Sequence, residues 1–183
     1  YDIKPYVPCE DRVPDSHIPQ ERGLQASAMP GGRETVTLYD MGNIKKIQGY
    51  YYLCPENFDS VAESVKGCSN LKVFWWFSRF DKKEYRRATQ GDPPYENAPR
   101  SGVYATRSPV RPNPIALTVA RVLRVDEQAC RIEVEGLDCF HNTPLIAVEP
   151  YVAEPDAVDG GAVPEWLAHW PDHKEFDEPS GGE

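Results

Sequence analysis

Residues 102–117, GVYATRSPVRPNPIAL, constrain this chain most, because polar residues and three prolines interrupt two apolar stretches. Residues 102–105 and 115–125 predict strands on either side of the interruption. Each proline fixes its own φ and keeps the preceding residue extended, so we expect a stiff connection. Such a loop suits recognition of a polar ligand, because it carries two guanidiniums, two hydroxyls and a carboxamide. The alternative is a solvated, proline-rich connection without a ligand.

Other stretches combine β-branched, aromatic or buried-type apolar residues and also predict strands. These stretches are 34–40, 44–53, 71–80, 131–135 and 145–148, with a turn at 126–129. Apolar residues at helical spacing predict an amphipathic helix over 55–66, and 165–170 predict a short one. Residues 81–99 are expected to form a substrate-facing loop, with a solvated charged loop as the alternative.

The run ATRSPVRPNPIAL resembles the signature of the TsaA/TrmO (YaeB-like) family, which reads approximately ATRS-x-x-RPNPIGLS. Members of that family are S-adenosylmethionine-dependent tRNA methyltransferases. The resemblance implies a mainly β fold, a small TsaA-like β-barrel with one or two short helices. It also implies S-adenosylmethionine as cofactor, the tRNA anticodon loop as partner, and N6-methylation of threonylcarbamoyl-adenosine at tRNA position 37 as the reaction.

Two other stretches carry the resemblance further. Residues 71–79, LKVFWWFSR, are similar to the family's LWVLFWFH-x, and residues 137–144, LDCFHNTP, are similar to LD-x-x-DGTP. The chain departs from the family at Ser78, Ala116 and His141, where relatives have His, Gly and Asp. The family's opening strand and its Ser-Pro loop are not recognisable before residue 34, so cofactor binding is a firmer expectation than methylation of tRNA.

The resemblance implies two sets of ligand-binding residues, while the catalytic base stays unidentified. The cofactor set is Ser78, Arg79, Arg107, Ser108, Leu117, Leu137, Asp138, Thr143 and Pro144. The substrate set is Arg111, Asn113, His141 and Tyr151. Asp138 is expected to contact the amino group of the cofactor, with turn capping as the alternative. Tyr104 and Tyr151 could stack on a base or belong to the core.

Arg107 and Arg111 stand four residues apart. An extended chain of about 3.3 Å per residue puts their Cα atoms up to roughly 13 Å apart, too far to fork one carboxylate without a turn between them. We therefore expect Arg107 to support the cofactor and Arg111 to face the acceptor; two plain surface charges are the alternative.

Charge is unevenly distributed along the chain, whose formal net charge is −9. Residues 71–124 carry eleven Lys or Arg against four Asp or Glu, and the remainder carries nine against twenty-five. A basic middle can steer a polyanion despite the acidic total, whereas a mixed surface with acidic tails is the alternative.

The five cysteines are odd in number and form no CxxC pair, so we expect free buried thiols in a reducing compartment and no metal site. The sequence shows no signal peptide and no apolar run of membrane length. We therefore expect a cytoplasmic protein without a membrane partner.

Short repeats suggest how the chain is divided. Pro5-Tyr6-Val7 returns as residues 150–152, so residues 1–16 predict the tail of an upstream repeat, unless the match is chance. Residues 17–33 predict a linker, 34–153 the barrel domain, and 154–183 an acidic tail with a short helix.

Two alternative functions stay open. One is a catalytically silent S-adenosylmethionine- or tRNA-binding module of a larger protein, and the other is a methyltransferase for a small-molecule acceptor. A homodimer is expected, because relatives place the cofactor site near a subunit interface. The aromatic run 74–77 also supplies more apolar surface than one small barrel is expected to bury.

Overall fold

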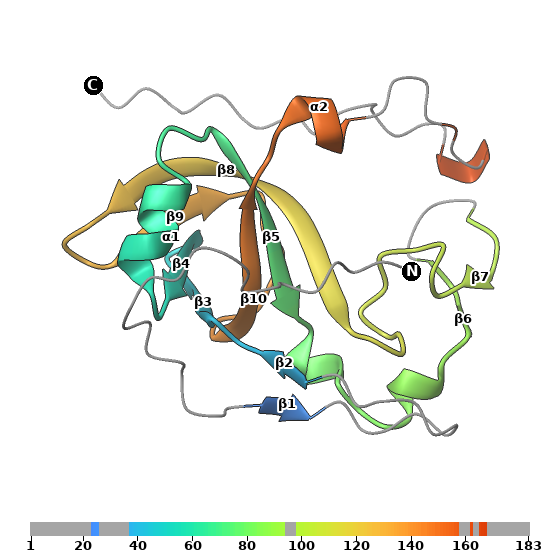
Figure 1. The fold of residues 1–183 in the computed structure, drawn as a ribbon. Helices are drawn as coiled ribbons and strands as arrows, with labels where there is room; N and C mark the ends of the chain where they lie inside the picture. Colours follow the sequence, from blue (N-terminus) through green and yellow to red (C-terminus); the bar gives the residue numbers. More distant parts are fainter. Residues whose placement is uncertain (1–22, 26–36, 94–97, 158–161, 163–164, 168–183) are drawn as a thin grey trace. The chain divides into compact units, whose positions relative to one another are not determined.

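Six antiparallel strands close into a barrel in the order β10-β3-β4-β9-β8-β5 (Figure 1). The computed structural model describes residues 23–25, 37–93, 98–157, 162 and 165–167. The barrel strands are β3 (Gly42–Ile47), β4 (Tyr50–Pro55), β5 (Asn70–Trp76), β8 (Ile115–Asp126), β9 (Arg131–Glu135) and β10 (Thr143–Pro150). The predicted mainly β fold, a small barrel with few helices, is confirmed.

Alternating side chains of these strands fill the barrel. Eight of them are completely buried: Ile44, Leu53, Leu71, Val73, Ala120, Ile132, Val134 and Leu145. Burial of each large apolar side chain contributes roughly 1.5–3 kcal/mol. A shift of register by one residue would turn this apolar set outward, so the core fixes which side chains face solvent.

Helix α1 (Phe58–Ser64) packs on the barrel through Phe58, and Val65 just beyond its last residue is also buried. The predicted helix over 55–66 is confirmed, but it is shorter at both ends. Pro55 belongs to β4, where it pairs with Gly42. After the helix, Gly67 adopts a φ of 79°, a left-handed conformation that suits glycine at a helix end.

The single strand predicted over 44–53 is wrong, because the chain reverses in its middle. β3 and β4 form a hairpin in which Ile47 pairs with Tyr50. The two turn residues, Gln48 and Gly49, have φ values of 51° and 90°. Such two-residue turns match the twist of the strands, but Gln-Gly lacks the usual Asn or Asp signal at the first position.

The strand predicted over 71–80 ends early. β5 stops at Trp76, and the chain turns into the 3₁₀ helix η1 (Ser78–Phe80). The Phe77 N–H donates to the Pro114 carbonyl at 2.8 Å, which ties this turn to the residues that precede β8. The apolar run therefore predicted the buried strand but not the turn that follows.

The strand predicted over 102–105 is also wrong. Only β7 (Ser101–Gly102) is extended, paired with β6 (Gln90–Gly91). Beyond it, the Ala105 N–H donates to the Gly102 carbonyl at 2.9 Å, so the chain turns. Tyr104 consequently lies in a turn, with 73% of its surface exposed.

The remaining strand predictions within the barrel are confirmed. The segments 115–125, 131–135 and 145–148 fall in β8, β9 and β10, and the turn between β8 and β9 follows Asp126. Residues 81–99 contain the 3₁₀ helix η2 (Tyr85–Arg87) and β6, while 94–97 lie outside the described residues.

The segments flanking the barrel are described in part. Residues 1–39 form a unit separate from residues 40–183. In the first unit, β1 (Gly23–Gln25) falls in the predicted linker and pairs with β2 (Thr37–Tyr39), which falls in the predicted strand 34–40. Residues 1–16, the rest of the linker, 34–36 and 168–183 lie outside the described residues.

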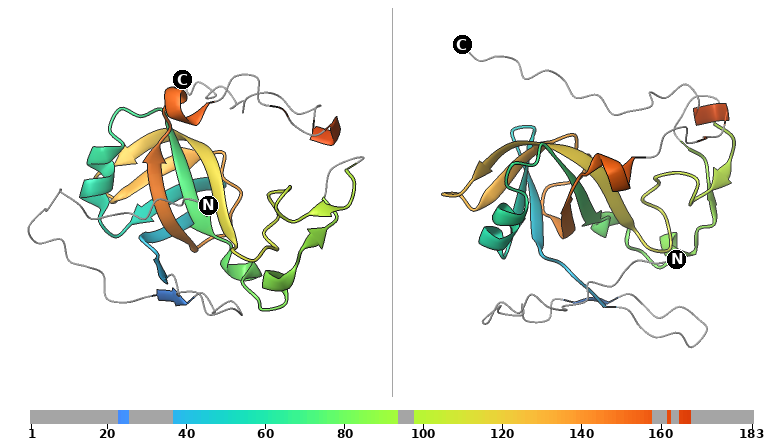
Figure 2. Two further views of the ribbon diagram at one scale, coloured as in Figure 1. Left: turned by 45° about the vertical axis from the view of Figure 1, so that its right-hand side comes forward. Right: turned by 45° about the horizontal axis from the view of Figure 1, so that its top comes forward.

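Two short helical turns follow the barrel, α2 (Ala153–Asp156) and the 3₁₀ helix η3 (Glu165–Leu167). η3 falls in the predicted helix over 165–170, of which 168–170 lie outside the described residues. Figures 1 and 2 show α2 and η1 at opposite ends of the barrel. Lys72 holds α2 through Asp156 at 2.7 Å and also pairs with Glu149 at 3.1 Å.

Candidate functional site

Antiparallel pairing brings three of the predicted ligand-binding segments to one end of the barrel. Trp76 at the end of β5 pairs with Ile115 at the start of β8, and Trp75 pairs with Leu145 near the start of β10. Residues 77–80, 103–114 and 137–144 therefore meet at what we call the loop end. Segments far apart in the sequence are neighbours there because a strand's end lies beside the starts of its antiparallel partners.

The loop over 106–114 is organised by its own hydroxyl groups. The Thr106 hydroxyl donates to the Val103 carbonyl at 3.4 Å and accepts from the Ser108 N–H at 3.3 Å. The Ser108 hydroxyl accepts from the Val110 N–H at 3.2 Å. Such local bonds replace strand pairing, which explains why this segment turns where extension was predicted.

Arg111 braces the same loop. Its Nη2 donates to the carbonyls of Thr106 at 2.6 Å and Val103 at 3.5 Å. Its Nε is buried and has no hydrogen-bond partner among the described residues. Arg107, by contrast, is exposed. The two arginines of the motif therefore have different surroundings.

An ion pair that the sequence did not reveal supports the loop from the side. Asp81 accepts from the Trp76 indole N–H at 3.1 Å and from Arg86 Nε at 2.5 Å. Arg86 Nη1 reaches on to the Pro112 carbonyl at 3.2 Å. The hydrogen bond from Arg86 holds the pKa of Asp81 below its usual value. The sequence placed Asp81 and Arg86 in one charged loop, and their spacing did not predict the ion pair between them.

Residues 137–144 alternate between the core and solvent. Leu137 and Cys139 are buried, whereas Asp138 and Phe140 are exposed. The buried Thr143 hydroxyl donates to the Phe140 carbonyl at 2.7 Å and closes the turn.

Asn142 and Cys139 in this segment differ in backbone conformation and in burial. Asn142 has a φ of 62°, as expected for a position where glycine is usual and asparagine is tolerated. Burial raises the pKa of the Cys139 thiol to about 12, so this thiol stays protonated near neutral pH.

Three contacts bind this segment to its neighbours at the loop end. The Arg79 guanidinium lies 4.0 Å from the centre of the Phe140 ring. His141 Nδ1 lies 3.2 Å from the backbone nitrogen of Lys46 and 3.0 Å from its carbonyl oxygen, and the tautomer decides which bond forms. The hairpin of β3 and β4 therefore joins the loop end, which the sequence did not predict.

The other predicted site residues differ in exposure and in their position relative to the loop end. Asn113 is exposed, and its carbonyl accepts from the Ile115 N–H at 2.8 Å. Ser78 and Leu117 are exposed, and Pro144 is half-buried. Tyr151 does not join the others, because its N–H donates to Asn70 at the opposite end of β5. A seven-residue strand at about 3.3 Å per residue separates the two ends by roughly 20 Å.

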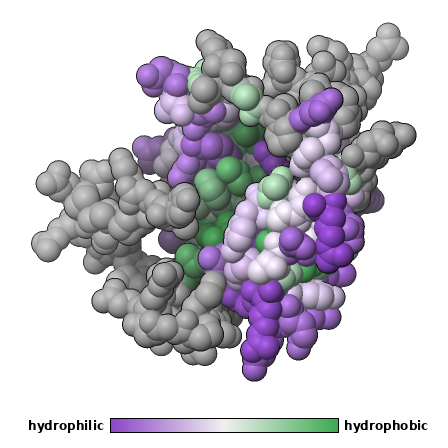
Figure 3. All heavy atoms as spheres, turned by 90° about the vertical axis from the view of Figure 1, so that its right-hand side faces the viewer, coloured by the Kyte–Doolittle hydropathy of each residue, from purple (hydrophilic) through white to green (hydrophobic). Residues whose placement is uncertain are grey.

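The basic middle of the sequence divides into two groups. On the barrel wall, Lys72, Arg121 and Arg124 form ion pairs with acidic side chains. Between β5 and β8, several cations are exposed and have no ion-pair partner among the described residues: Lys83, Arg87, Arg100 and Arg107. Figure 3 shows apolar surface between hydrophilic side chains on the side that carries this connection.

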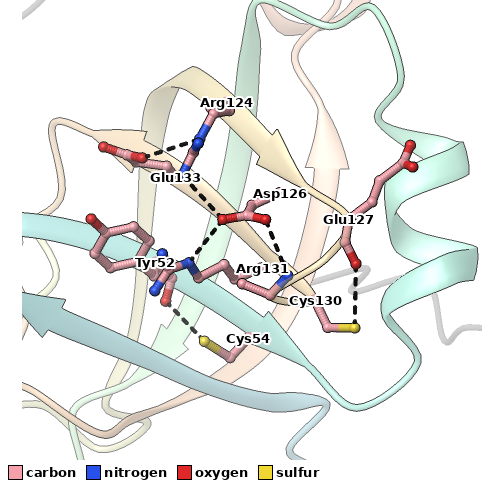
Figure 4. Close-up of polar contacts among 9 residues, drawn as sticks. Tyr52, Cys54, Arg124, Asp126, Glu127, Cys130, Arg131 and Glu133 are labelled. Atoms are coloured by element: carbon pink, nitrogen blue, oxygen red, sulfur yellow. Dashed lines mark hydrogen bonds and ion pairs between the residues drawn. The ribbon is translucent and has the colours of Figure 1, made fainter.

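A second polar cluster lies at the hairpin of β8 and β9 (Figure 4). The Asp126 carboxylate contacts Arg124 Nη2 at 3.0 Å and Arg131 Nε at 3.5 Å, and it accepts from the Ala129 N–H at 3.1 Å. The Arg131 guanidinium lies 4.3 Å from the centre of the Tyr52 ring. With its charges neutralised locally, this cluster stabilises the hairpin and leaves few free groups for a ligand.

The described residues contain no group of three His, Cys, Asp or Glu side chains that could hold a metal ion. Among the cysteines they include, Cys139 is buried and Cys130 is exposed, so the expectation of buried thiols holds only in part; Cys9 lies outside them. No helix in the described part of the chain is long and apolar enough to cross a membrane.

Comparison with known proteins places this barrel in context. Residues 40–157 match the family model described as the tRNA-methyltransferase O N-terminal domain. The chain resembles the fold of the crystal structure of TrmO from Pseudomonas aeruginosa, with a TM-score of 0.53, 22% identity, and coverage of 70% of this chain and 61% of that one.

Two curated relatives are more similar in sequence. A human protein named tRNA (adenine(37)-N6)-methyltransferase is 35% identical over 101 residues, which are 55% of this chain but only 22% of that protein. An Archaeoglobus fulgidus protein named S-adenosyl-L-methionine-binding protein is 35% identical over 105 residues, covering 56% of this chain and 70% of that protein.

Proposed function

Because the chain belongs to the tRNA-methyltransferase O N-terminal domain family, we propose that it is an S-adenosylmethionine-dependent methyltransferase acting on tRNA. The acceptor we propose is N6 of threonylcarbamoyl-adenosine 37, beside the anticodon. One observation carries the proposal: the loop over 106–114, the end of β5 and the segment 137–144 converge at one end of the barrel. A base in a tRNA loop is unpaired already, so presenting it to such a surface costs less than extrusion from a duplex.

The residues at the loop end fit the proposed cofactor. Arg79 and Arg107 offer exposed guanidiniums, and Asp138 offers an exposed carboxylate for an ammonium group. When bound, S-adenosylmethionine supplies an electrophilic methyl group on a sulfonium. We propose that the cofactor set holds it: Ser78, Arg79, Arg107, Ser108, Leu117, Leu137, Asp138, Thr143 and Pro144.

Some of these residues act through the backbone that they support. The hydroxyls of Ser108 and Thr143 are already engaged within their own turns, so we propose that they shape the site. Among the substrate set, Asn113 and His141 are exposed at the loop end, and Arg111 acts through the loop it braces. Tyr151 lies at the opposite end of β5, so it could contact the substrate only at a surface away from the loop end. Holding donor and acceptor in line, with little water between them, is the main catalytic task for such a site.

A silent cofactor-binding module is the second candidate, favoured by the Archaeoglobus relative whose name mentions binding alone. Incubation of the chain with bulk tRNA and S-adenosylmethionine labelled in its methyl group separates the two. The enzyme transfers label to RNA, whereas a silent module binds S-adenosylhomocysteine by calorimetry and transfers none. Label in small metabolites but not in RNA would indicate a different acceptor.

We also propose a homodimer, on a different apolar surface from the aromatic run. Trp75 and Trp76 are 3% and 2% exposed, so one barrel covers most of the aromatic run. Leu117 and Leu123 on β8 are 44% and 39% exposed and offer apolar surface for a second copy. Light scattering over a wide concentration range tests it, and a constant monomer mass contradicts it. We also propose a cytoplasmic location, where the proposed tRNA substrate is available.

A further inference from the structure

Lys46 stands at the loop end but belongs to no motif. It pairs with Tyr51 across the hairpin of β3 and β4, and its Nζ lies 4.9 Å from the centre of the Tyr51 ring. His141 contacts both backbone polar groups of Lys46, which docks the segment 137–144 against this residue. The backbone of Lys46 is thereby held beside the segment that carries Asp138, while its ammonium lies over the Tyr51 ring.

The charges of Lys46 and Asp138 influence each other without forming an ion pair. Tyr51 raises the pKa of Lys46 most, through a hydrogen bond and its charge, and the Asp138 carboxylate raises it further. No ion pair joins Lys46 and Asp138 within the described residues, and both side chains are exposed. An ammonium and a carboxylate that are neighbours without being paired can each take an opposite charge from a ligand.

We propose that Lys46 and Asp138 bind the zwitterionic amino-acid end of a ligand, with Lys46 taking its carboxylate and Asp138 its ammonium. The inference rests on the proposed function, because the methionine end of S-adenosylmethionine is such a zwitterion. It adds to that function a binding residue on β3, outside the three segments that pairing brings together. The neighbouring Phe140 ring, stacked by Arg79, borders the same end with an aromatic surface.

Binding of two small probes tests this assignment without any turnover. S-adenosylhomocysteine carries the zwitterion, whereas 5′-methylthioadenosine has the same adenosine and thioether but lacks it. Calorimetry on the whole chain should show that Lys46→Gln weakens S-adenosylhomocysteine about tenfold or more, as expected for a lost charge-assisted hydrogen bond. Binding of 5′-methylthioadenosine should stay within about twofold of wild type, since it makes no contact with Lys46.

Lys45→Gln is the matched control, because Lys45 is exposed on the same strand and pairs with Tyr52 instead. It should leave both affinities unchanged, and an unchanged melting temperature of Lys46→Gln excludes misfolding as the cause. Wild-type affinity of Lys46→Gln for S-adenosylhomocysteine overturns the proposal. So does a loss that appears only in the KM for tRNA, which would assign Lys46 to the carboxylate of the acceptor's threonyl group.

The outcomes separate this inference from the proposed function. If the wild-type chain discriminates between the two probes through Lys46 but transfers no methyl group to tRNA, the proposed function fails and the inference stands. If the chain methylates tRNA while Lys46→Gln binds both probes normally, the function stands and the inference fails. Absence of S-adenosylhomocysteine binding by the wild type overturns both.

Discussion

Arg107 and Arg111 belong to one motif, and the structure gives them different surroundings. Arg111 donates to two carbonyls of its own loop, whereas Arg107 is exposed. Thr106 and Ser108 bond to nearby backbone groups, so the loop turns between the two arginines. The stiffness expected from its prolines stays a prediction, and the choice of hydrogen-bond partners depends on the folded geometry.

Removal of the Arg111 side chain should therefore destabilise the loop. Arg111→Ala leaves the Thr106 carbonyl without its donor and the Val103 carbonyl with the Thr106 hydroxyl alone, which costs about 1–3 kcal/mol. Arg111→Lys should not restore stability, because an ammonium lacks the planar fork that spans two acceptors. Urea unfolding measures the loss, and Arg107→Ala is the control with wild-type stability. Equal stability of both alanine variants would show that Arg111 braces nothing.

Cys139 leads to a pH prediction. Burial raises the pKa of its thiol to about 12 in the folded chain, against roughly 8.5 in an unfolded one. Above pH 8.5 the unfolded chain loses this proton first, so unfolding becomes easier as the pH rises toward 12. Stability should fall across that range in the wild type and fall less steeply in Cys139→Ala. Unfolding at a series of alkaline pH values provides the measurement, and parallel curves for the two proteins would contradict it.

At the scale of elements, strands with long alternating or apolar patterns were predictable, and their ends were not. β9 follows from its sequence, because buried residues alternate along it, and β8 follows from its run of apolar and β-branched residues. The hairpin of β3 and β4 was not predicted, because Gln48 adopts a left-handed conformation that is unusual for glutamine. The family signature located the loop end, whereas Asp81 and Arg86 act only through contacts between elements.

Arg86 should act as a positioning residue for the loop over 106–114. Arg86→Ala detaches Asp81 and the Pro112 carbonyl at once, so affinity for S-adenosylhomocysteine should fall roughly tenfold. The tryptophan emission should change too, because Asp81 also holds the Trp76 indole. Arg87→Ala is the matched control, since Arg87 is exposed in the same 3₁₀ helix. Unchanged emission and affinity in Arg86→Ala would remove the positioning role.

At the scale of the whole molecule, the acidic total conceals a basic end. The net charge of −9 alone argues against RNA, but cations of the barrel wall are neutralised locally while Arg87, Arg100 and Arg107 are not. The sequence predicted the basic stretch correctly. It could not separate paired from unpaired cations, because the acidic partners Glu133, Glu135 and Glu149 lie beyond that stretch in the sequence.

The difference between paired and unpaired cations predicts how tRNA binding depends on salt. Affinity for tRNA should fall as potassium chloride rises, with a logarithmic slope of about −0.7 for each single-stranded phosphate neutralised. Replacing Arg87 and Arg100 together by Gln should reduce the magnitude of that slope by about 1.4, or 0.7 for each cation removed. Arg124→Gln is the control, because Arg124 already pairs with Asp126. Filter binding across salt concentrations gives the slopes. An equal effect of Arg124→Gln would argue against the claim that the unpaired cations, and not the paired ones, contact the RNA.

The most direct test of methyl transfer compares two tRNA preparations, one carrying threonylcarbamoyl-adenosine at position 37 and one lacking that modification. Each is incubated with the chain and S-adenosylmethionine, and its nucleosides are then resolved by chromatography and mass spectrometry. We expect the first preparation to gain a threonylcarbamoyl-adenosine with one added methyl group, while the second gains no methylated adenosine. An unmethylated threonylcarbamoyl-adenosine from a chain that binds S-adenosylhomocysteine and is supplied with saturating S-adenosylmethionine would contradict it.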